Sequence, residues 1–186
     1  KINKLEKSIT KVKSFKGNLG IGHTRWATHG EPSNENSHPH TSNSNELHIV
    51  HNGIIENYSS LKEELIAKGF HFNSDTDTEV LVNLIEYIQT KEKIKLGEAV
   101  QLALNQVVGA YSIAVIDIKK PDEIVVAKLG SPLCIGIGKD EYFVGSDVTP
   151  FLDHTKKVVY LKDGEMAIIR NHKPTRYRKI GDDSFI

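Results

Sequence analysis

The side chains best suited to chemistry gather in one window near the start of the chain. Residues 23–30 read His-Thr-Arg-Trp-Ala-Thr-His-Gly, so an arginine, an indole, two hydroxyls and two imidazoles share eight positions. The apolar run at 19–22 predicts a strand over 19–26. Because a guanidinium can hold a carboxylate through two parallel hydrogen bonds, Arg25 suits the capture of a small carboxylate ligand. The neighbouring hydroxyls and imidazoles favour this interpretation over an arginine in a surface ion pair.

A second candidate is the pair Asn52 and Gly53, which follows an apolar run over 47–51 that predicts a strand. Asn-Gly is a strong hairpin-turn signal, but the next residues lead into a predicted helix over 57–68 and not into a second strand. The alternative is an oxyanion hole. The Asn52 side-chain amide and the Gly53 N–H can both donate to a developing negative charge, and glycine lets the backbone come close.

Asp77 is the third candidate. It lies in the sequence Ser-Asp-Thr-Asp-Thr-Glu at 74–79, which resembles the capping box that begins a helix. The helix dipole stabilises an acidic residue in the first turn, and that alone would explain Asp77. The same carboxylate could equally hold a ligand ammonium. With Arg25 it would then form an amino-acid pocket with one cation and one anion.

Histidines suggest a metal site, because six of the nine lie between positions 23 and 51. Their spacings match no standard zinc pattern and no cysteine supports them, while His48 and His51 would point to opposite faces of a strand. The sequence therefore predicts no metal and no cofactor, and a metalloprotein is the third choice. Cys134, the single cysteine, lies in the apolar run Leu-Cys-Ile and is expected to be a buried, inert thiol.

Composition excludes several classes of function. The 186 residues carry 24 basic and 24 acidic side chains, which gives no electrostatic reason to expect nucleic acid or an anionic membrane as a partner. No apolar run is long enough to span a bilayer, and the first residues lack the apolar core of a signal peptide. One cysteine allows no intrachain disulfide, so a reducing, cytoplasmic setting is the expectation.

The expected elements fall into separate helical and strand-rich parts. The sequence predicts helices over 1–13, 57–68, from about 76 onward and over 96–107, and a long polar loop over 27–46. It predicts further strands over 110–116, 123–129, 132–137, 142–145, 158–161 and 166–170. Three helices between two strand-rich parts indicate an α+β fold. We expect a single domain over 1–186, with its core at about 18–170 and a polar linker over 171–186.

Taken together, these motifs resemble one family, the glutaminase (class II glutamine amidotransferase) domains of glutamine–fructose-6-phosphate aminotransferases. The resemblance rests on residues 23–32, 38–40, 50–57 and 74–79, and it continues at 109–112, 130–133 and 145–147. It covers most of the chain from about Gly20 to Arg170. Amidophosphoribosyltransferases share the looser outline, but usually not the tryptophan and the Ala-Thr-His-Gly run.

The resemblance implies an N-terminal-nucleophile hydrolase fold, a four-layer αββα sandwich of two antiparallel sheets between helical layers. It also implies roles for the candidate residues. Arg25 would bind the α-carboxylate of L-glutamine and Asp77 its α-ammonium. Asn52 and Gly53 would form the oxyanion hole.

Three neighbours of Arg25 receive roles in the same way. Thr28 and His29 would line the glutamine pocket, and Trp26 would lie where ammonia passes toward a synthase domain. The implied activity is the release of ammonia from glutamine to make glucosamine 6-phosphate from fructose 6-phosphate, which isomerase domains absent from this chain would bind. The parent protein is expected to be a homodimer.

The main departure from the family concerns its nucleophile, an N-terminal cysteine whose own α-amine acts as the base. Residue 1 is Lys1 here, and Cys134 lies at a position that the family does not use. The chain is therefore expected to be an N-terminally truncated fragment that keeps the pocket and the oxyanion donors but is inactive alone. The alternatives are a catalytically silent amino-acid-binding module and the glutaminase domain of another class II amidotransferase.

Overall fold

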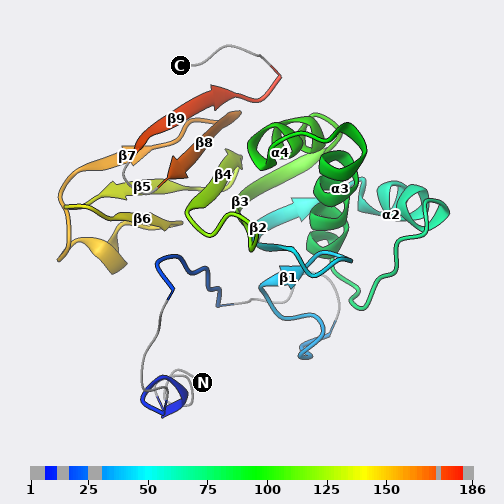
Figure 1. Cartoon of the computed structure of the whole chain (residues 1–186), viewed down its shortest axis with the longest axis horizontal. Helices are drawn as coiled ribbons and strands as arrows, with labels where there is room; N and C mark the ends of the chain where they lie inside the picture. The colour runs from blue at the N-terminus through cyan, green and yellow to red at the C-terminus, as the bar shows by residue number, and fades with distance from the viewer. Residues whose placement is uncertain (1–6, 12–16, 25–30, 171–172, 182–186) are drawn as a thin grey trace.

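Two antiparallel β-sheets and a layer of helices make up the fold, as Figure 1 shows for the computed structural model of the chain. The structure describes residues 7–11, 17–24, 31–170 and 173–181. Helices cover one face of the larger sheet, and the smaller sheet packs on the other side through a shared cluster of buried apolar side chains. This arrangement confirms the predicted α+β class.

The larger sheet has six strands in the order β1-β2-β3-β4-β8-β9, with every neighbouring pair antiparallel. Its strands are β1 His40–Thr41, β2 Leu47–Ile55, β3 Gly109–Asp117, β4 Glu123–Leu129, β8 Glu165–Arg170 and β9 Lys173–Lys179. β2 and β3 pair over nine consecutive positions. Because side chains alternate along a strand, β2 presents one set of residues to the helices and the other to the smaller sheet.

The smaller sheet has the order β6-β5-β7. Its strands are β5 Cys134–Ile137, β6 Tyr142–Gly145 and β7 Val158–Tyr160, and the short 3-10 helix η1, Thr149–Phe151, lies between the last two. Ile135 faces the larger sheet in the shared apolar cluster. The ring of Phe151 lies over Gly136, the next residue of β5, so η1 covers the outer face of this sheet.

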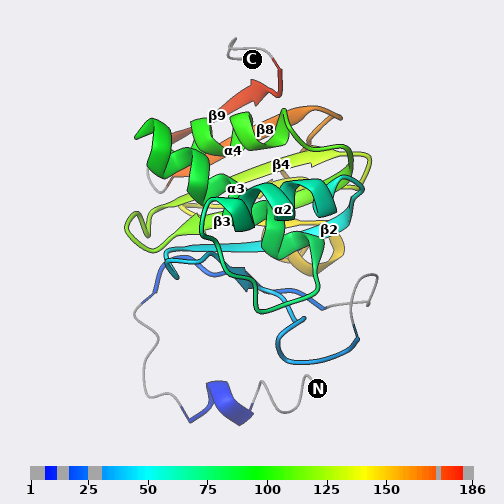
Figure 2. The same cartoon turned by 90° about the vertical axis from the view of Figure 1, so that its right-hand side faces the viewer.

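α3 Asp77–Glu92 and α4 Leu96–Leu104 cover the outer face of the larger sheet, and α2 Tyr58–Ala67 packs against α3 (Figure 1 and Figure 2). α3 begins at Asp77 because the hydroxyl of Thr76 accepts a hydrogen bond from the Glu79 N–H at 3.3 Å. No helix in the described part of the chain is both long and apolar enough to cross a membrane.

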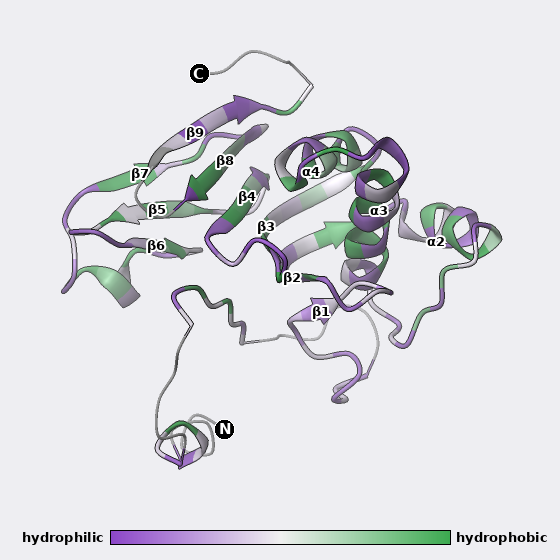
Figure 3. Ribbon diagram, in the orientation of Figure 1, coloured by the Kyte–Doolittle hydropathy of each residue, from purple (hydrophilic) through white to green (hydrophobic). Residues whose placement is uncertain are grey.

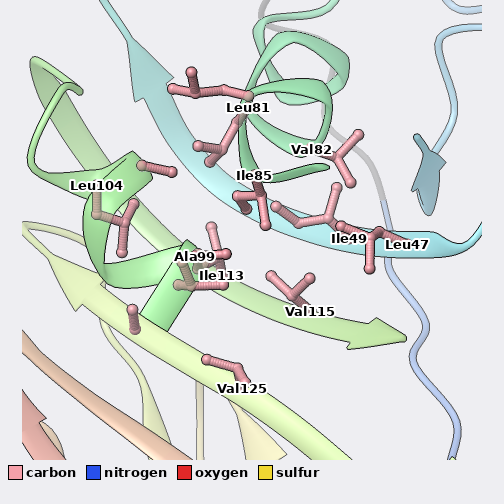
Figure 4. Close-up of a cluster of buried hydrophobic side chains, with 14 of the residues drawn as sticks. Leu47, Ile49, Leu81, Val82, Ile85, Ala99, Leu104, Ile113, Val115 and Val125 are labelled. Carbon is pink, nitrogen blue, oxygen red and sulfur yellow. The ribbon is translucent and has the colours of Figure 1, made fainter. Parts of the chain in front are cut away.

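The main core lies between α3 and the larger sheet (Figure 4). Leu81, Ile85 and Ile88 recur every three or four residues and therefore share one face of α3. Leu47 and Ile49 alternate along β2 and point toward that face. The matching of these two periodicities buries both elements at once and fixes α3 against β2.

Most predicted elements are confirmed. The helix predicted over 57–68 is α2, the one from about 76 is α3, and the one over 96–107 is α4, which ends earlier at Leu104. β4 and β6 span the residues predicted for them, and the remaining strands of the second half differ by a few residues at their ends. Of the helix predicted over 1–13, residues 7–9 are helical within the described part.

The prediction of a strand over 19–26 was wrong for the described residues 19–24, which form no ladder. Leu19 and Ile21 instead pack as irregular chain against the apolar cluster between the sheets. Alternation of apolar residues and glycine produced the strand signal. Burial of two apolar side chains satisfies the same pattern without strand pairing.

The predicted linker over 171–186 was also wrong in part, because Lys173–Lys179 forms β9 and pairs with β8. Figure 3 shows β9 in largely hydrophilic colours. β9 lies at the edge of the sheet, where charged side chains discourage pairing with other chains. Its polar composition therefore reflects an edge strand and not an unstructured tail.

Replacing Ile85 with alanine tests the placement of the core. Ile85 is 0% exposed, so Ile85→Ala should lower the free energy of unfolding by about 2–5 kcal/mol through lost burial and a cavity. Ile66 of α2 is 54% exposed, and Ile66→Ala should change the free energy of unfolding by less than about 1 kcal/mol. Urea unfolding measures both. Equal losses for the two variants would contradict this assignment of the core.

Candidate active site

A cavity of about 840 Å³ lies between the two sheets. Its apolar walls come from both sheets, with Val50 and Ile169 on the larger one and Val144 on the smaller. Its polar lining includes Asn52 of β2 and Ser112 of β3, whose Cα atoms are paired across the ladder. A cavity that combines apolar walls with polar groups at fixed positions is typical of small-molecule sites.

The prediction that β2 ends before Asn52 and Gly53 was wrong, because the strand continues to Ile55. The pairing with β3 overrides the local turn signal of Asn-Gly. Gly53 has a φ of +132°, and a Cβ built there would lie 2.1 Å from the carbonyl oxygen of Ala110. Glycine is therefore required at this position, where the backbones of β2 and β3 approach closely.

Asn52 and Gly53 thus lie on a rigid strand and not in a turn. The side chain of Asn52 lines the cavity, whereas Gly53 is not among the residues that line it. Rigid placement suits an oxyanion hole, because preorganised donors need no rearrangement during the reaction. The oxyanion role of the pair stays a prediction.

Asp77 is the first residue of α3, and it is only 3% exposed. Its Oδ2 accepts a hydrogen bond from the Ile55 N–H at 2.8 Å, and its Oδ1 accepts one from the Thr78 hydroxyl at 3.4 Å. These contacts hold Asp77 beside Ile55, the last residue of β2, and Gly53 lies shortly before Ile55 in the same strand. Each carboxylate oxygen can accept two hydrogen bonds, so capacity for an ammonium remains. Asp77 is not among the residues that line the cavity.

Three histidine rings form a row that leads from α3 to Asn52. His40 Nε2 lies 3.0 Å from the Thr76 hydroxyl. The His40 ring meets the His38 ring edge-on at 4.8 Å, and the His38 ring stacks on His23 at 4.3 Å. His23 Nε2 lies 2.6 Å from Asn52 Oδ1. Sequence reasoning missed this row, because no spacing pattern identifies rings that stack on one another.

The other two histidines of the early window that are described take opposite sides of β2, as predicted. His51 is buried with its Nδ1 2.9 Å from the Thr78 hydroxyl, whereas His48 pairs with Thr41 of β1 at 3.1 Å. Within the described residues, no group of three or more histidine, cysteine or acidic side chains is placed to hold a metal ion.

A buried asparagine fixes the loop before this row to the start of α3. Asn36 donates from its amide to the Glu31 carbonyl at 3.0 Å, and its Oδ1 accepts from the Asp75 N–H at 2.9 Å. The Glu79 carboxylate accepts the N–H groups of Asn73 and Ser74 at 2.9 and 2.7 Å. Sequence reasoning did not single out Asn36, because nothing in the sequence distinguishes a buried asparagine that anchors a loop from an exposed loop asparagine.

Four of the predicted site residues, Arg25, Trp26, Thr28 and His29, lie outside the described residues. Their predicted roles stay predictions.

Cys134 is buried, as predicted, with 2% of its surface exposed. Its Sγ lies 3.2 Å from the Gly145 carbonyl oxygen. Burial, together with the nearby charge of Asp147, raises the pKa of the thiol. Since the thiolate is the nucleophilic form, this cysteine is poorly suited to attack a substrate.

A comparison with known protein families matches residues 11–177 to the family described as glutamine amidotransferase domain. The chain is also similar to named enzymes. It is 56% identical over 173 residues to a glutamine–fructose-6-phosphate aminotransferase (isomerizing) of Bacteroides thetaiotaomicron, and 55% identical over 152 residues to that of Chlorobaculum tepidum. The alignments cover 93% and 81% of this chain but 28% and 25% of those enzymes. The chain therefore spans little more than a quarter of the length of these relatives.

Solved structures with the same fold include the glutamine phosphoribosylpyrophosphate amidotransferase of B. subtilis, with a TM-score of 0.70 and 29% identity. A structure described as the allosteric regulatory enzyme of purine biosynthesis gives a TM-score of 0.71 and 30% identity. The matches cover 88% and 85% of this chain and 35% and 34% of those chains. They bear out the expected N-terminal-nucleophile hydrolase type of fold.

Substituting Gly53 tests the close approach of β2 and β3. Gly53→Ala should lower the free energy of unfolding by roughly 3 kcal/mol or more, because a strained φ and a collision with the Ala110 backbone add together. Gly164 also has a positive φ, +77°, but its Cβ would meet nothing within 4 Å, so Gly164→Ala should cost only about 1 kcal/mol. Urea unfolding of the two variants gives the comparison. Similar losses would show that the contact with Ala110 is not decisive.

Cys134 reactivity tests the assignment of this thiol as structural. In the native protein at pH 8, labelling by Ellman's reagent should be slow, because the thiol is buried and its pKa is raised. Unfolding in urea should expose one fast-reacting thiol, and Cys134→Ser should remove the signal. Fast labelling of the native protein would contradict the assignment.

Proposed function

The chain belongs to the glutamine amidotransferase domain family, and from this premise we propose that it is the glutamine-hydrolysing, ammonia-donating part of a glutamine–fructose-6-phosphate aminotransferase. The observation that carries the proposal is the 56% identity over 173 residues to an enzyme of that name. The first substrate would be L-glutamine. Ammonia released from it would reach fructose 6-phosphate, bound by the part of the enzyme that this chain does not span, and would give glucosamine 6-phosphate.

The ligand-binding groups divide into a charge-recognition pair and a polarising pair. Arg25 would hold the α-carboxylate of glutamine through its guanidinium fork, and Asp77 would accept hydrogen bonds from the α-ammonium. Asn52 and Gly53 would donate to the amide oxygen as it gains negative charge. Asp77 and Gly53 both lie near the end of β2, which supports a ligand that extends along this strand.

The remaining residues would shape the surroundings of the amide. Thr28 and His29 would line the glutamine pocket, and Trp26 would lie where ammonia leaves it. Hydrolysis begins when a nucleophile adds to the amide carbon, and the negative charge then collects on the former carbonyl oxygen. The resemblance assigns this attack to a cysteine thiolate. No cofactor enters the proposal.

A second candidate function is a catalytically silent amino-acid-binding module. The observation that favours it is the state of Cys134, the only cysteine in these 186 residues, which is buried with a raised pKa. The two candidates share L-glutamine as ligand. Detection of glutamate formation would separate them. A homodimeric parent enzyme in the cytoplasm, without nucleic acid as a partner, stays a prediction.

Calorimetric titration with L-glutamine tests the charge-recognition pair. Asp77→Asn keeps the acceptor for the Ile55 N–H but removes the charge, so it should weaken glutamine binding at least about tenfold, or about 1.4 kcal/mol. The same substitution should not affect the binding of glutaramic acid, which is glutamine without its α-amino group. Arg25→Ala should weaken the binding of both compounds by at least about tenfold, because both carry the carboxylate.

This pattern of losses separates recognition from damage to the fold. If Asp77→Asn weakens L-glutamine and glutaramic acid equally, the residue acts through the structure and not through the ammonium. If the unmodified chain binds neither compound, the proposed amino-acid pocket is contradicted for this chain.

A further inference from the structure

We propose that His23 is a positioning residue for Asn52, and that it holds the asparagine side chain with its NH2 group available to the substrate oxygen. This inference rests on the proposed function, because it assumes that Asn52 polarises an amide oxygen. Both residues line the cavity between the sheets, although 29 positions separate them in the sequence. Their contact is a tertiary one that joins the irregular segment at 17–24 to the middle of β2.

The geometry of the contact fixes which atom of Asn52 faces His23. His23 Nε2 lies 2.6 Å from Asn52 Oδ1, which is a short hydrogen bond. An amide oxygen can only accept, so His23 Nε2 carries the proton and donates it. The NH2 group of Asn52 then points away from His23. Among the described residues, Nδ2 of Asn52 has no hydrogen-bond partner, which leaves both of its hydrogens for a ligand in the cavity.

The other ring nitrogen of His23 supports the same assignment. Its Nδ1 is buried and has no hydrogen-bond partner among the described residues. A proton on this atom would be a buried donor without an acceptor, which is costly. A proton on Nε2 alone keeps the donor to Asn52 in place and leaves no unpaired donor on the buried Nδ1.

Packing holds the His23 ring in position. The His38 ring stacks on it at 4.3 Å with an angle of 25° between the ring planes. His38 is in turn held by the His51 N–H, which donates to His38 Nδ1 at 3.4 Å, and by the edge of the His40 ring. His40 contacts Thr76 at the start of α3. The donor to Asn52 is therefore supported from the helix layer through one edge-on and one stacked ring contact.

Asn52 needs such a support, because the terminal torsion of asparagine is broad and roughly two-fold. A flipped amide would place Oδ1, and not NH2, toward the substrate oxygen and would repel the negative charge that develops there. Ser112, which faces Asn52 across the ladder, forms no side-chain hydrogen bond within the described part of the chain and so does not fix the amide. His23 is the group that discriminates between the two orientations.

The test compares His23→Phe with His23→Gln in glutamine hydrolysis by the full-length protein. Phenylalanine keeps the flat ring for stacking but removes the donor, so kcat should fall at least about tenfold while KM changes less than about twofold. Glutamine places an amide N–H near the position of Nε2 and should recover most of that loss. His71→Phe, which alters an exposed histidine away from the cavity, is the matched control.

Asn52 variants test whether His23 acts through it. Asn52→Ala should lower kcat by about 10²–10³-fold, the usual cost of removing one oxyanion donor. Adding His23→Phe to Asn52→Ala should then cause little further loss, because the group that His23 positions is gone. Independent, multiplying losses in the double variant, or a His23→Gln enzyme as slow as His23→Phe, would overturn the proposal.

A measurement without turnover separates this inference from the proposed function. In the ¹⁵N-labelled chain, the side-chain NH2 signals of Asn52 should shift strongly in His23→Phe and little in His23→Gln, and His23 should show its proton on Nε2. If the wild-type enzyme does not hydrolyse glutamine, the proposed function fails, and these signals still decide whether His23 orients Asn52. Unchanged Asn52 signals in His23→Phe would overturn the positioning role.

Discussion

The rest of the structure depends on the pairing of β2 with β3. Nine consecutive pairs run from Leu47 opposite Asp117 to Ile55 opposite Gly109, and this ladder has the core on one face and the candidate site on the other. Side chains such as Ile49 pack under α3, whereas Val50 and Asn52 face the space between the sheets. Any shift of register by one residue would exchange the two sets, so the stability of the core fixes the position of Asn52.

A polar network at the start of α3 complements that ladder. Glu79 holds the residues before the helix, Asn36 ties the preceding loop to Asp75, and Asp77 accepts the N–H of Ile55 at the end of β2. Buried polar groups of this kind are costly when unpaired and directional when paired. The network therefore fixes where α3, the loop before it and the end of β2 meet. Two of the candidate site residues, Asp77 and Gly53, lie at or near this point.

Chemistry and periodicity in the sequence predicted much of the fold and part of the site. The β-rich run between turn signals predicted β4 over its full length, and the motif Thr-Asp-Thr-Glu predicted a helix that begins near residue 76, where α3 begins at Asp77. The continuation of β2 through Gly53 was not predictable, because the Asn-Gly signal is local whereas the partner strand lies near Ala110.

The contact between His23 and Asn52 was hidden for the same reason, since stacking and side-chain hydrogen bonds across 29 residues leave no short-range pattern. The segment 19–24 shows the opposite failure. A local pattern typical of a strand is present there, but the tertiary structure uses it for packing between the sheets.

The most direct test of the proposed glutamine site is a crystal structure of the protein with L-glutamate, the product of glutamine hydrolysis, bound there. We expect the α-ammonium within hydrogen-bond distance of the Asp77 carboxylate, and the γ-carboxylate at the Asn52 side-chain amide and the Gly53 N–H. Glutamate bound in the reverse direction, or away from β2, would contradict the proposed site.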